Sequence, residues 1–273
     1  MGAALISTLG LKQNITGGAF EALTPGTGDS FSVPSYRPGS TAWLLEAWGA
    51  NSTTKCQFRI RSPRLHDNVQ GIRLAAQFNP TQSGADGNPQ LYLPPYVRQM
   101  LYPSDTLTVE VNGTAMDDVD LIYLTYFEDF PGISANLRTW EEIQARIVNT
   151  LGVLVTPTAG AANDYGTSEA LNADDDRLKA DAEYAVLGLT VDLPCTSIGI
   201  RGPDTGNYRI ACPGHWDSQR SAGFFVALSQ MYGLPLIPVI HSNNKGTTLV
   251  DAVDAAGATA PNVTLILAEL ASF

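Results

Sequence analysis

Aspartates are the residues of this sequence whose type and spacing come closest to suggesting chemistry. They form two clusters, whose main members are Asp117, Asp118, Asp120, Asp174, Asp175 and Asp176. Carboxylate oxygens are hard ligands, so either cluster could gather a structural calcium ion in a loop between subunits. Neither cluster has the Asp-x-Asp-x-Asp-Gly spacing of an EF-hand, and solvated acidic loops are the interpretation that the spacing favours. No other cofactor is expected.

A serine nucleophile is a second possibility. Gly28-Asp29-Ser30-Phe31 resembles the nucleophile block of the GDSL esterases. That chemistry needs a Ser activated by a His, and in that family an Asp stands three residues before the His. No histidine of this chain has an Asp there; the residues found instead are Pro63, Cys212 and Pro238. A Gly-Asp-Ser turn is therefore the favoured interpretation.

The tripeptide Asp204-Thr205-Gly206 matches the loop of aspartic proteases. A carboxylate dyad needs two such loops, and the sequence has one, so a tight turn between strands is expected. Three scattered cysteines and three histidines supply a zinc site poorly, and there is no phosphate loop or dinucleotide fingerprint. These observations predict a protein that is not an enzyme.

The charge balance limits the partners. Lys and Arg number 16 against 27 Asp and Glu, a net charge of −11, which disfavours binding to nucleic acid through a basic face. Charged residues make up 16%, below the roughly 25% of ordinary domains. The first residues lack a signal-peptide pattern and no apolar run is long enough to span a membrane, so we expect synthesis in a cytoplasm.

An internal repeat is the most informative feature of the sequence for the secondary-structure elements that would position these candidate residues. Ile60-Arg61-x-Pro63 in the first half of the chain aligns with Ile200-Arg201-x-Pro203 in the second half. Weaker matches follow in the same order and at similar separations: 41–48 lies near 184–191, 106–111 matches 248–253, and 118–124 matches 262–268. Duplication is the favoured interpretation, and two β-rich stretches of similar composition are the alternative.

The period within each copy is that of strands. Val109 and Val111 alternate with Thr108 and Glu110, as on a half-buried antiparallel strand. Gly, Pro and Asn punctuate the chain at short intervals, which is typical of a β-sandwich or jelly roll.

One segment departs from this pattern. Apolar residues at three- and four-residue spacing predict an amphipathic helix over 133–151, with Ser134 or Asn136 as N-cap. A second helical piece is expected over 218–231, and 156–176 has the composition of a linker or surface loop. The fold expected is thus mainly β: two tandem jelly-roll or β-sandwich units related by duplication, with a connecting helix. The predicted division is 1–132 for the first sandwich, 133–175 for helix and linker, and 176–273 for the second sandwich.

Two similar sandwich units in a charge-poor chain resemble the double jelly-roll major capsid proteins of tailless icosahedral phages. The resemblance rests on this architecture and on the Ile-Arg-x-Pro repeat. It implies a bacteriophage structural protein that forms the capsid shell as trimers, with itself and other virion proteins as partners and the virion as its location. Three chains of two jelly rolls would make a pseudo-hexagonal capsomer. An acidic balance and the lack of a basic arm depart from what contact with a genome would need.

Two alternatives remain open. A capsid decoration or tail-associated protein could use the same tandem sandwiches. A tandem carbohydrate-binding module is the alternative of another class, because Trp43, Trp48 and the other aromatic residues could line a sugar-binding face.

Overall fold

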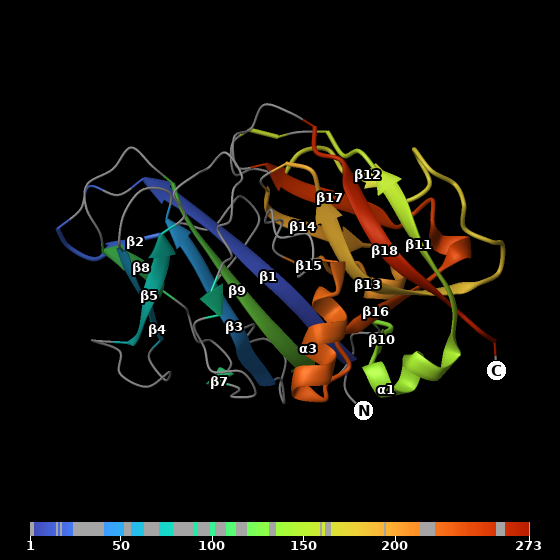
Figure 1. Cartoon of the computed structure of the whole chain (residues 1–273), viewed down its shortest axis with the longest axis horizontal. Coiled ribbons are helices and arrows are strands. Elements are labelled where there is room, and N and C mark those ends of the chain that lie inside the picture. The colour runs from blue at the N-terminus through green and yellow to red at the C-terminus, as the bar shows by residue number, and fades with distance from the viewer. Residues whose placement is uncertain are drawn as a thin grey trace. The chain divides into compact units, whose positions relative to one another are not determined.

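The computed structural model (Figure 1) describes two compact units, Thr8–Phe130 and Met1–Ser7 with Pro131–Phe273, and each is treated by itself. The residues described are 3–14, 16, 18–23, 41–51, 56–62, 71–78, 90–91, 99–101, 108–112, 119–130, 135–158, 160–161, 165–193, 195–212, 222–254 and 260–272.

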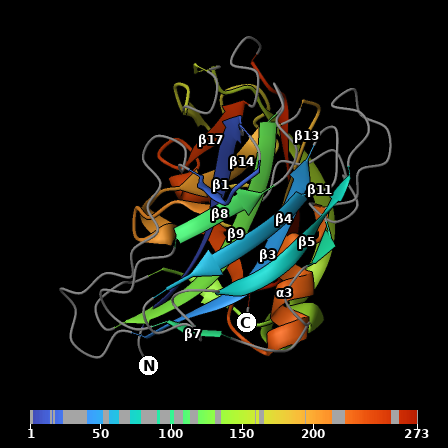
Figure 2. The same cartoon turned by 90° about the vertical axis from the view of Figure 1, so that its left-hand side faces the viewer.

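The first unit is built from strands. Their bounds are β1 (Ala3–Asn14, of which the part from Thr8 onward belongs to this unit), β2 (Glu21–Ala22), β3 (Thr41–Asn51), β4 (Cys56–Arg61), β5 (Ile72–Phe78), β6 (Gln90–Leu91), β7 (Gln99–Leu101), β8 (Thr108–Asn112) and β9 (Val119–Phe130). They are hydrogen-bonded in the order β1-β9-β3-β5-β4-β8-β2, and β6 and β7 also pair with β3. A two-residue parallel contact joins β3 to β5, whereas β4 pairs antiparallel with both β5 and β8, its neighbours in Figure 2.

The described residues of the second unit form two sheets and two short helices. Its strands are β10 (Leu137–Arg138), β11 (Ile147–Val155), β12 (Glu169–Ala170), β13 (Glu183–Val191), β14 (Cys195–Arg201), β15 (Ile210–Cys212), β16 (Ile237–His241), β17 (Leu249–Asp254) and β18 (Val263–Leu270). Its helices are α1 (Trp140–Ile143) and α3 (Phe224–Tyr232), with single 3-10 turns η1 (Gln144–Arg146), η2 (Pro203–Thr205) and η3 (Ser242–Asn244). One sheet has the order β10-β16-β13-β18-β11 and the other the order β12-β17-β14-β15. All their strand pairs are antiparallel.

Strand pairing is nested in both units. In the second unit β11 pairs with β18, β12 with β17, β13 with β16, and β14 with β15. In the first unit β1 pairs with β9, β2 with β8, β3 with β7, and β4 with β5. In each unit, the first strand along the chain thus pairs with the last, and the strands between them pair in the same way toward the middle of the unit's sequence.

A β-bulge occurs at the same place in both units. The pairing of β3 with β9 shifts between Leu44 and Glu46, which makes Leu45 the extra residue. The pairing of β13 with β18 shifts between Val186 and Gly188, which makes Leu187 the extra residue. Leu45 and Leu187 are separated in the sequence by nearly the same interval as the two copies of Ile-Arg-x-Pro.

Alternating burial explains why these segments are strands. Ile60, Val109 and Val111 are fully buried and Gln57 is exposed, but Glu110, which the alternation places on the opposite face from the two valines, is buried as well. The core of the second unit takes buried apolar side chains from both of its sheets, among them Val153, Leu265 and Ile200. The mainly β, antiparallel fold expected from the sequence is confirmed.

The amphipathic helix predicted over 133–151 is wrong. Thr139 caps a helix of one turn, in a capping box with Glu142, and neither Ser134 nor Asn136 is its N-cap. The chain then enters β11, which pairs with β18 along its length. Val and Ile suit a pleated strand, and pairing with a long partner outweighs a helical spacing of apolar residues.

The second predicted helix, 218–231, forms over its described part as α3 (Phe224–Tyr232), and residues 218–221 lie outside the described residues. It contacts β13 and β16 through buried residues that include Phe225 and Leu228. The predicted linker, 156–176, holds only the two-residue strand β12 and an isolated bridge at Tyr165 among its described residues. The domain boundaries expected from the sequence stay a prediction.

Candidate functional site

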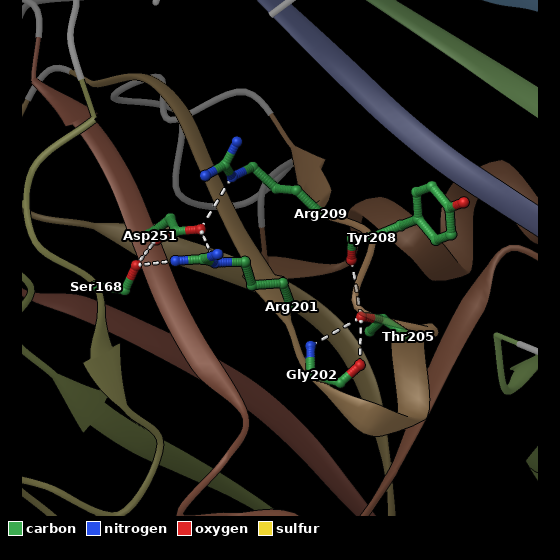
Figure 3. A network of polar contacts seen from close by, with 7 residues as sticks. All are labelled: Ser168, Arg201, Gly202, Thr205, Tyr208, Arg209 and Asp251. Atoms are coloured by element: carbon green, nitrogen blue, oxygen red, sulfur yellow. Dashed lines mark hydrogen bonds and ion pairs between the residues drawn. The ribbon is translucent and has the colours of Figure 1, made fainter. Parts of the chain in front are cut away.

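A buried carboxylate in the second unit is the centre of a network of polar contacts, drawn in Figure 3. Asp251 on β17 is 2% exposed. Its Oδ2 accepts a hydrogen bond from Arg209 Nε at 2.9 Å and lies 3.2 Å from Arg201 Nε, while its Oδ1 accepts one from the Ser168 hydroxyl. Arg201 Nη2 in turn donates to Ser168 Oγ at 2.7 Å. We call these four residues the Asp251 clamp.

Sheet register positions the clamp. Val250 and Ala252 face the core, so Asp251 between them points to the opposite face of the sheet. Gly199 on β14 lies directly opposite Asp251, and a Cβ there would come within 2.9 Å of the Ile210 carbonyl oxygen. The Arg209 guanidinium stacks over the Tyr165 ring, 3.6 Å from its centroid, in a cation–π contact.

The first unit contains a similar network around Glu110 on β8. Glu110 is buried and forms ion pairs with Arg59 and Arg61, both from β4. The Arg59 guanidinium lies 4.1 Å from the centroid of the Phe20 ring. We call Glu110, Arg59 and Arg61 the Glu110 clamp. In both units a buried carboxylate therefore meets two arginines, one of which stacks on an aromatic ring.

The two clamps occupy corresponding positions. Ile60 lies opposite Val109, and Ile200 lies opposite Val250, so the residue after each valine, Glu110 or Asp251, has the same place in its sheet. The sequence comparison had matched 106–111 with 248–253, one residue out of this register, and so did not pair the two carboxylates.

A further sequence match was also missed. Thr8-Leu9-Gly10 and Thr150-Leu151-Gly152 are identical tripeptides, and they fall in β1 and β11, the outermost strand of each nested set. Their separation in the sequence equals that of the two bulge residues. A search for identical tripeptides separated by about the same number of residues as the two copies of Ile-Arg-x-Pro would have found them.

The Asp204-Thr205-Gly206 tripeptide forms a turn, as expected. It closes a 3-10 turn after β14, where the Thr205 hydroxyl accepts from the Gly202 N–H at 2.9 Å and lies 2.8 Å from the Tyr208 carbonyl oxygen (Figure 3). Asp204 Oδ2 accepts from the His241 N–H and the Asn244 amide, both at 3.0 Å. This carboxylate therefore holds loops together. Gly28–Phe31 lies outside the described residues.

The second acidic cluster is dispersed over separate partners. Asp174 accepts from the Thr156 N–H at 2.6 Å, Asp175 pairs with Arg177, and Asp176 pairs with Lys245. Of the first cluster, Asp117 and Asp118 lie outside the described residues, as does the side chain of Asp120 on β9. In the described part of the chain, no three His, Cys, Asp or Glu side chains lie together in a way that could hold a metal ion.

Other reactive groups are engaged or buried. His241 Nδ1 accepts from the Asn243 N–H at 3.2 Å, and its Nε2 lies 3.6 Å from Asp181 Oδ1. Burial raises the pKa of the Cys212 thiol far above its ordinary value, which leaves little thiolate at neutral pH. No helix among the described residues is long and apolar enough to cross a membrane.

Comparisons with known proteins add little to this description. Neither family models nor curated proteins give a match to the sequence. Among solved structures, the chain is similar to one from the cryo-EM structure of T=1 Penaeus vannamei nodavirus, at 12% identity and a TM-score of 0.23, with 100% of this chain and 99% of that chain covered. So low a score does not establish a common fold.

Proposed function

We propose that this chain is a non-enzymatic structural protein of a virion, a capsid building block made of two jelly rolls related by internal duplication. A jelly roll is a double-sheet architecture of eight antiparallel strands wrapped as two Greek keys. The observation that carries the proposal is the nested pairing of early with late strands, from the outside of each unit's sequence inward, found in both units.

Three correspondences support duplication. The bulges at Leu45 and Leu187 fall at the same point of the same strand pair. The carboxylates of the two clamps occupy the same register position. The two Thr-Leu-Gly tripeptides lie in β1 and β11, the strands that begin the nested pairing of each unit. Two unrelated sandwiches would have no reason to share all three at nearly the same separation in the sequence.

A structural role is supported by how the buried carboxylates are used. Glu110, Asp251 and Glu269 are the buried acids among the described residues, and each is matched by basic side chains of the same unit. A general acid or base needs access to a substrate proton, which such ion pairs do not offer. The low charge content is also what a surface largely covered by neighbouring subunits would have.

The finer proposal follows the resemblance to tailless phage capsid proteins. Three copies would assemble around a three-fold axis, so that six jelly rolls form a pseudo-hexagonal unit of the shell. The partners would be further copies and other virion proteins. A decoration or tail-associated protein is the alternative within this class, and a carbohydrate-binding module is the alternative outside it. Structural calcium at Asp117, Asp118 and Asp120 stays a prediction, which dissociation by a chelator would test.

Measurement of the native mass tests the proposal. Light scattering of the purified chain should give about three times its 29.1 kDa, and negative-stain imaging of the largest species should show hexagonal capsomers or closed particles. A chain that stays monomeric over the whole accessible concentration range, without particles, would rule out a shell-forming role. A glycan-binding screen on that monomer would then decide for or against the carbohydrate-binding alternative.

A further inference from the structure

The strand β11 forms one end of its sheet in the second unit. Among the described strands it pairs only with β18, so its other edge carries backbone groups that a further strand could bind. Its nine residues, Ile147 to Val155, include no charged residue and no proline. The exposed large apolar side chains of the described part of the chain, Val148 at 60% and Leu154 at 39%, both belong to it.

Side chains from one short segment cover half of this open edge. Arg177 Nη2 donates to the Gly152 carbonyl oxygen, and the Thr156 N–H donates to Asp174 Oδ2. Asp175 lies beside the same edge, where its pKa is lowered chiefly by Arg177 and also by the backbone of Leu154. Residues 152, 154 and 156 alternate, as backbone groups that point away from the neighbouring strand must. Asp175 and Arg177 also pair with each other, which fixes both.

We propose that Asp174, Asp175 and Arg177 form an edge guard, which prevents β11 from pairing with β11 of a second copy of this chain. Exposed edge strands are templates for strand addition, and natural proteins block them with charged groups. The guard does so here from outside the strand, since β11 has no charge of its own.

A second copy is the partner that this edge fits. Two identical strands pair antiparallel about a two-fold axis, so β11 is complementary to itself without any further adaptation. The chain carries a net charge of −11, yet β11 is neutral, so two copies can approach along this edge without placing like charges opposite each other. Among the described residues, no side chain hydrogen-bonds to the backbone of Val148 to Thr150, and a stretch of that length is short for stable pairing with another strand.

The neighbouring Asp176 supplies a control within the same acidic cluster. It pairs with Lys245 and makes no described contact with β11. Its replacement removes a carboxylate from this cluster and breaks an ion pair, as the replacement of Asp175 does, yet it leaves the edge covered. The inference does not depend on the proposed capsid role, because it concerns the edge of one sheet in one unit.

The test removes the two guard residues that lie along β11 itself, Asp175 and Arg177, and measures self-association. The variant with Asp175→Ala and Arg177→Ala should show at least a two-fold increase in native mass over the unaltered chain, rising with concentration. Hydrogen exchange should show amides of residues 150–156 gaining protection as concentration rises. The control Asp176→Ala should behave like the unaltered chain, and adding Thr150→Pro to the guard variant should reverse its association, because that proline removes an edge N–H.

Circular dichroism establishes that each variant is folded, and Arg177→Met replaces the alanine variant if the latter is not, because methionine keeps the length of the side chain but cannot donate to the Gly152 carbonyl oxygen. A folded guard variant with the native mass and the β11 exchange rates of the unaltered chain would overturn the proposal. Equal association of the Asp176→Ala chain would overturn it as well, since loss of a charged side chain from this cluster, rather than exposure of the edge, would then be responsible. Failure of the unaltered chain to form trimers or shells would bear on the capsid proposal alone.

Discussion

Replacing Asp251 by Asn should destabilise the second unit by removing the one negative charge that its two clamp arginines share. Asn is close to Asp in size, so the substitution changes charge and hydrogen bonding with little change in packing. The amide group would present N–H donors to a guanidinium that itself only donates. Arg201 and Arg209 would be left with an unmatched positive charge beside a buried site.

The size of the effect follows from the burial of the three groups. Removing one partner of a buried ion pair costs about 3–5 kcal/mol when both partners are buried. Asp251 meets that condition, but the side chain of Arg201 is 41% exposed and that of Arg209 is 25% exposed, so water compensates part of the loss. We expect a loss of about 2–3 kcal/mol in the free energy of unfolding. For a unit of this size that corresponds to about 5–10 °C in Tm.

Urea denaturation followed by tryptophan fluorescence and circular dichroism measures this loss. The matched control is Asp176→Asn, whose ion pair with Lys245 is far more exposed and should cost less than about 1 kcal/mol. A loss below about 1 kcal/mol for Asp251→Asn would refute the reasoning, because it would mean that the clamp contributes no more than a surface ion pair. Adding Arg209→Gln to Asp251→Asn should recover part of the stability.

Two further predictions concern a glycine and the buried thiols. Gly71 has φ +63°, and a Cβ there would clash with the Ile60 carbonyl oxygen. Gly71→Ala should therefore lower the free energy of unfolding, measured with denaturant, by more than about 2 kcal/mol. The control Gly233→Ala should cost about 1 kcal/mol, because φ is +62° there too but the space is open. Cys195 and Cys212 are buried, and a raised pKa keeps Cys212 protonated above pH 8. In a Cys56→Ser background, the native protein should therefore react with an aromatic disulfide reagent at least about 100-fold more slowly than the unfolded protein. Equal rates would show that these strands open freely.

Much of the strand content could be predicted because burial on one face of a sheet leaves a period of two in the sequence. Ile60, Val109 and Val111 are buried as that period requires. The Ile-Arg-x-Pro repeat likewise falls at the ends of β4 and β14, strands with the same neighbours in each unit. Each signal is carried by a short run of residues, so both can be detected in a single sequence without any knowledge of the fold.

The segment 133–151 shows where a local signal fails. Its apolar spacing fits a helix, but its last residues belong to β11, which pairs with β18, a strand near the other end of the unit's sequence. A strand partner so distant in the sequence contributes hydrogen bonds and packing that no short window contains.

The clamps and the edge guard show the same limit for side chains. Sequence alone presented Asp174 and Asp175 as an acidic cluster, for which calcium was one interpretation. Their contacts with the backbone of β11 and the residue after it depend on how the chain folds back along that strand. Asp251 carried no signal at all, because what makes it unusual is its burial beside Arg201 and Arg209, which come from another part of the sequence.

By itself, then, the sequence determined a mainly β chain with a repeated pattern, low charge and an acidic balance, because composition and period reflect burial directly. The tertiary structure decided the nested strand order, the register that brings Glu110 and Asp251 to corresponding places, and the edge that Asp175 and Arg177 cover. Those properties arise from pairing between segments distant in sequence, and such pairing is selected by the whole sheet rather than by any one stretch of residues.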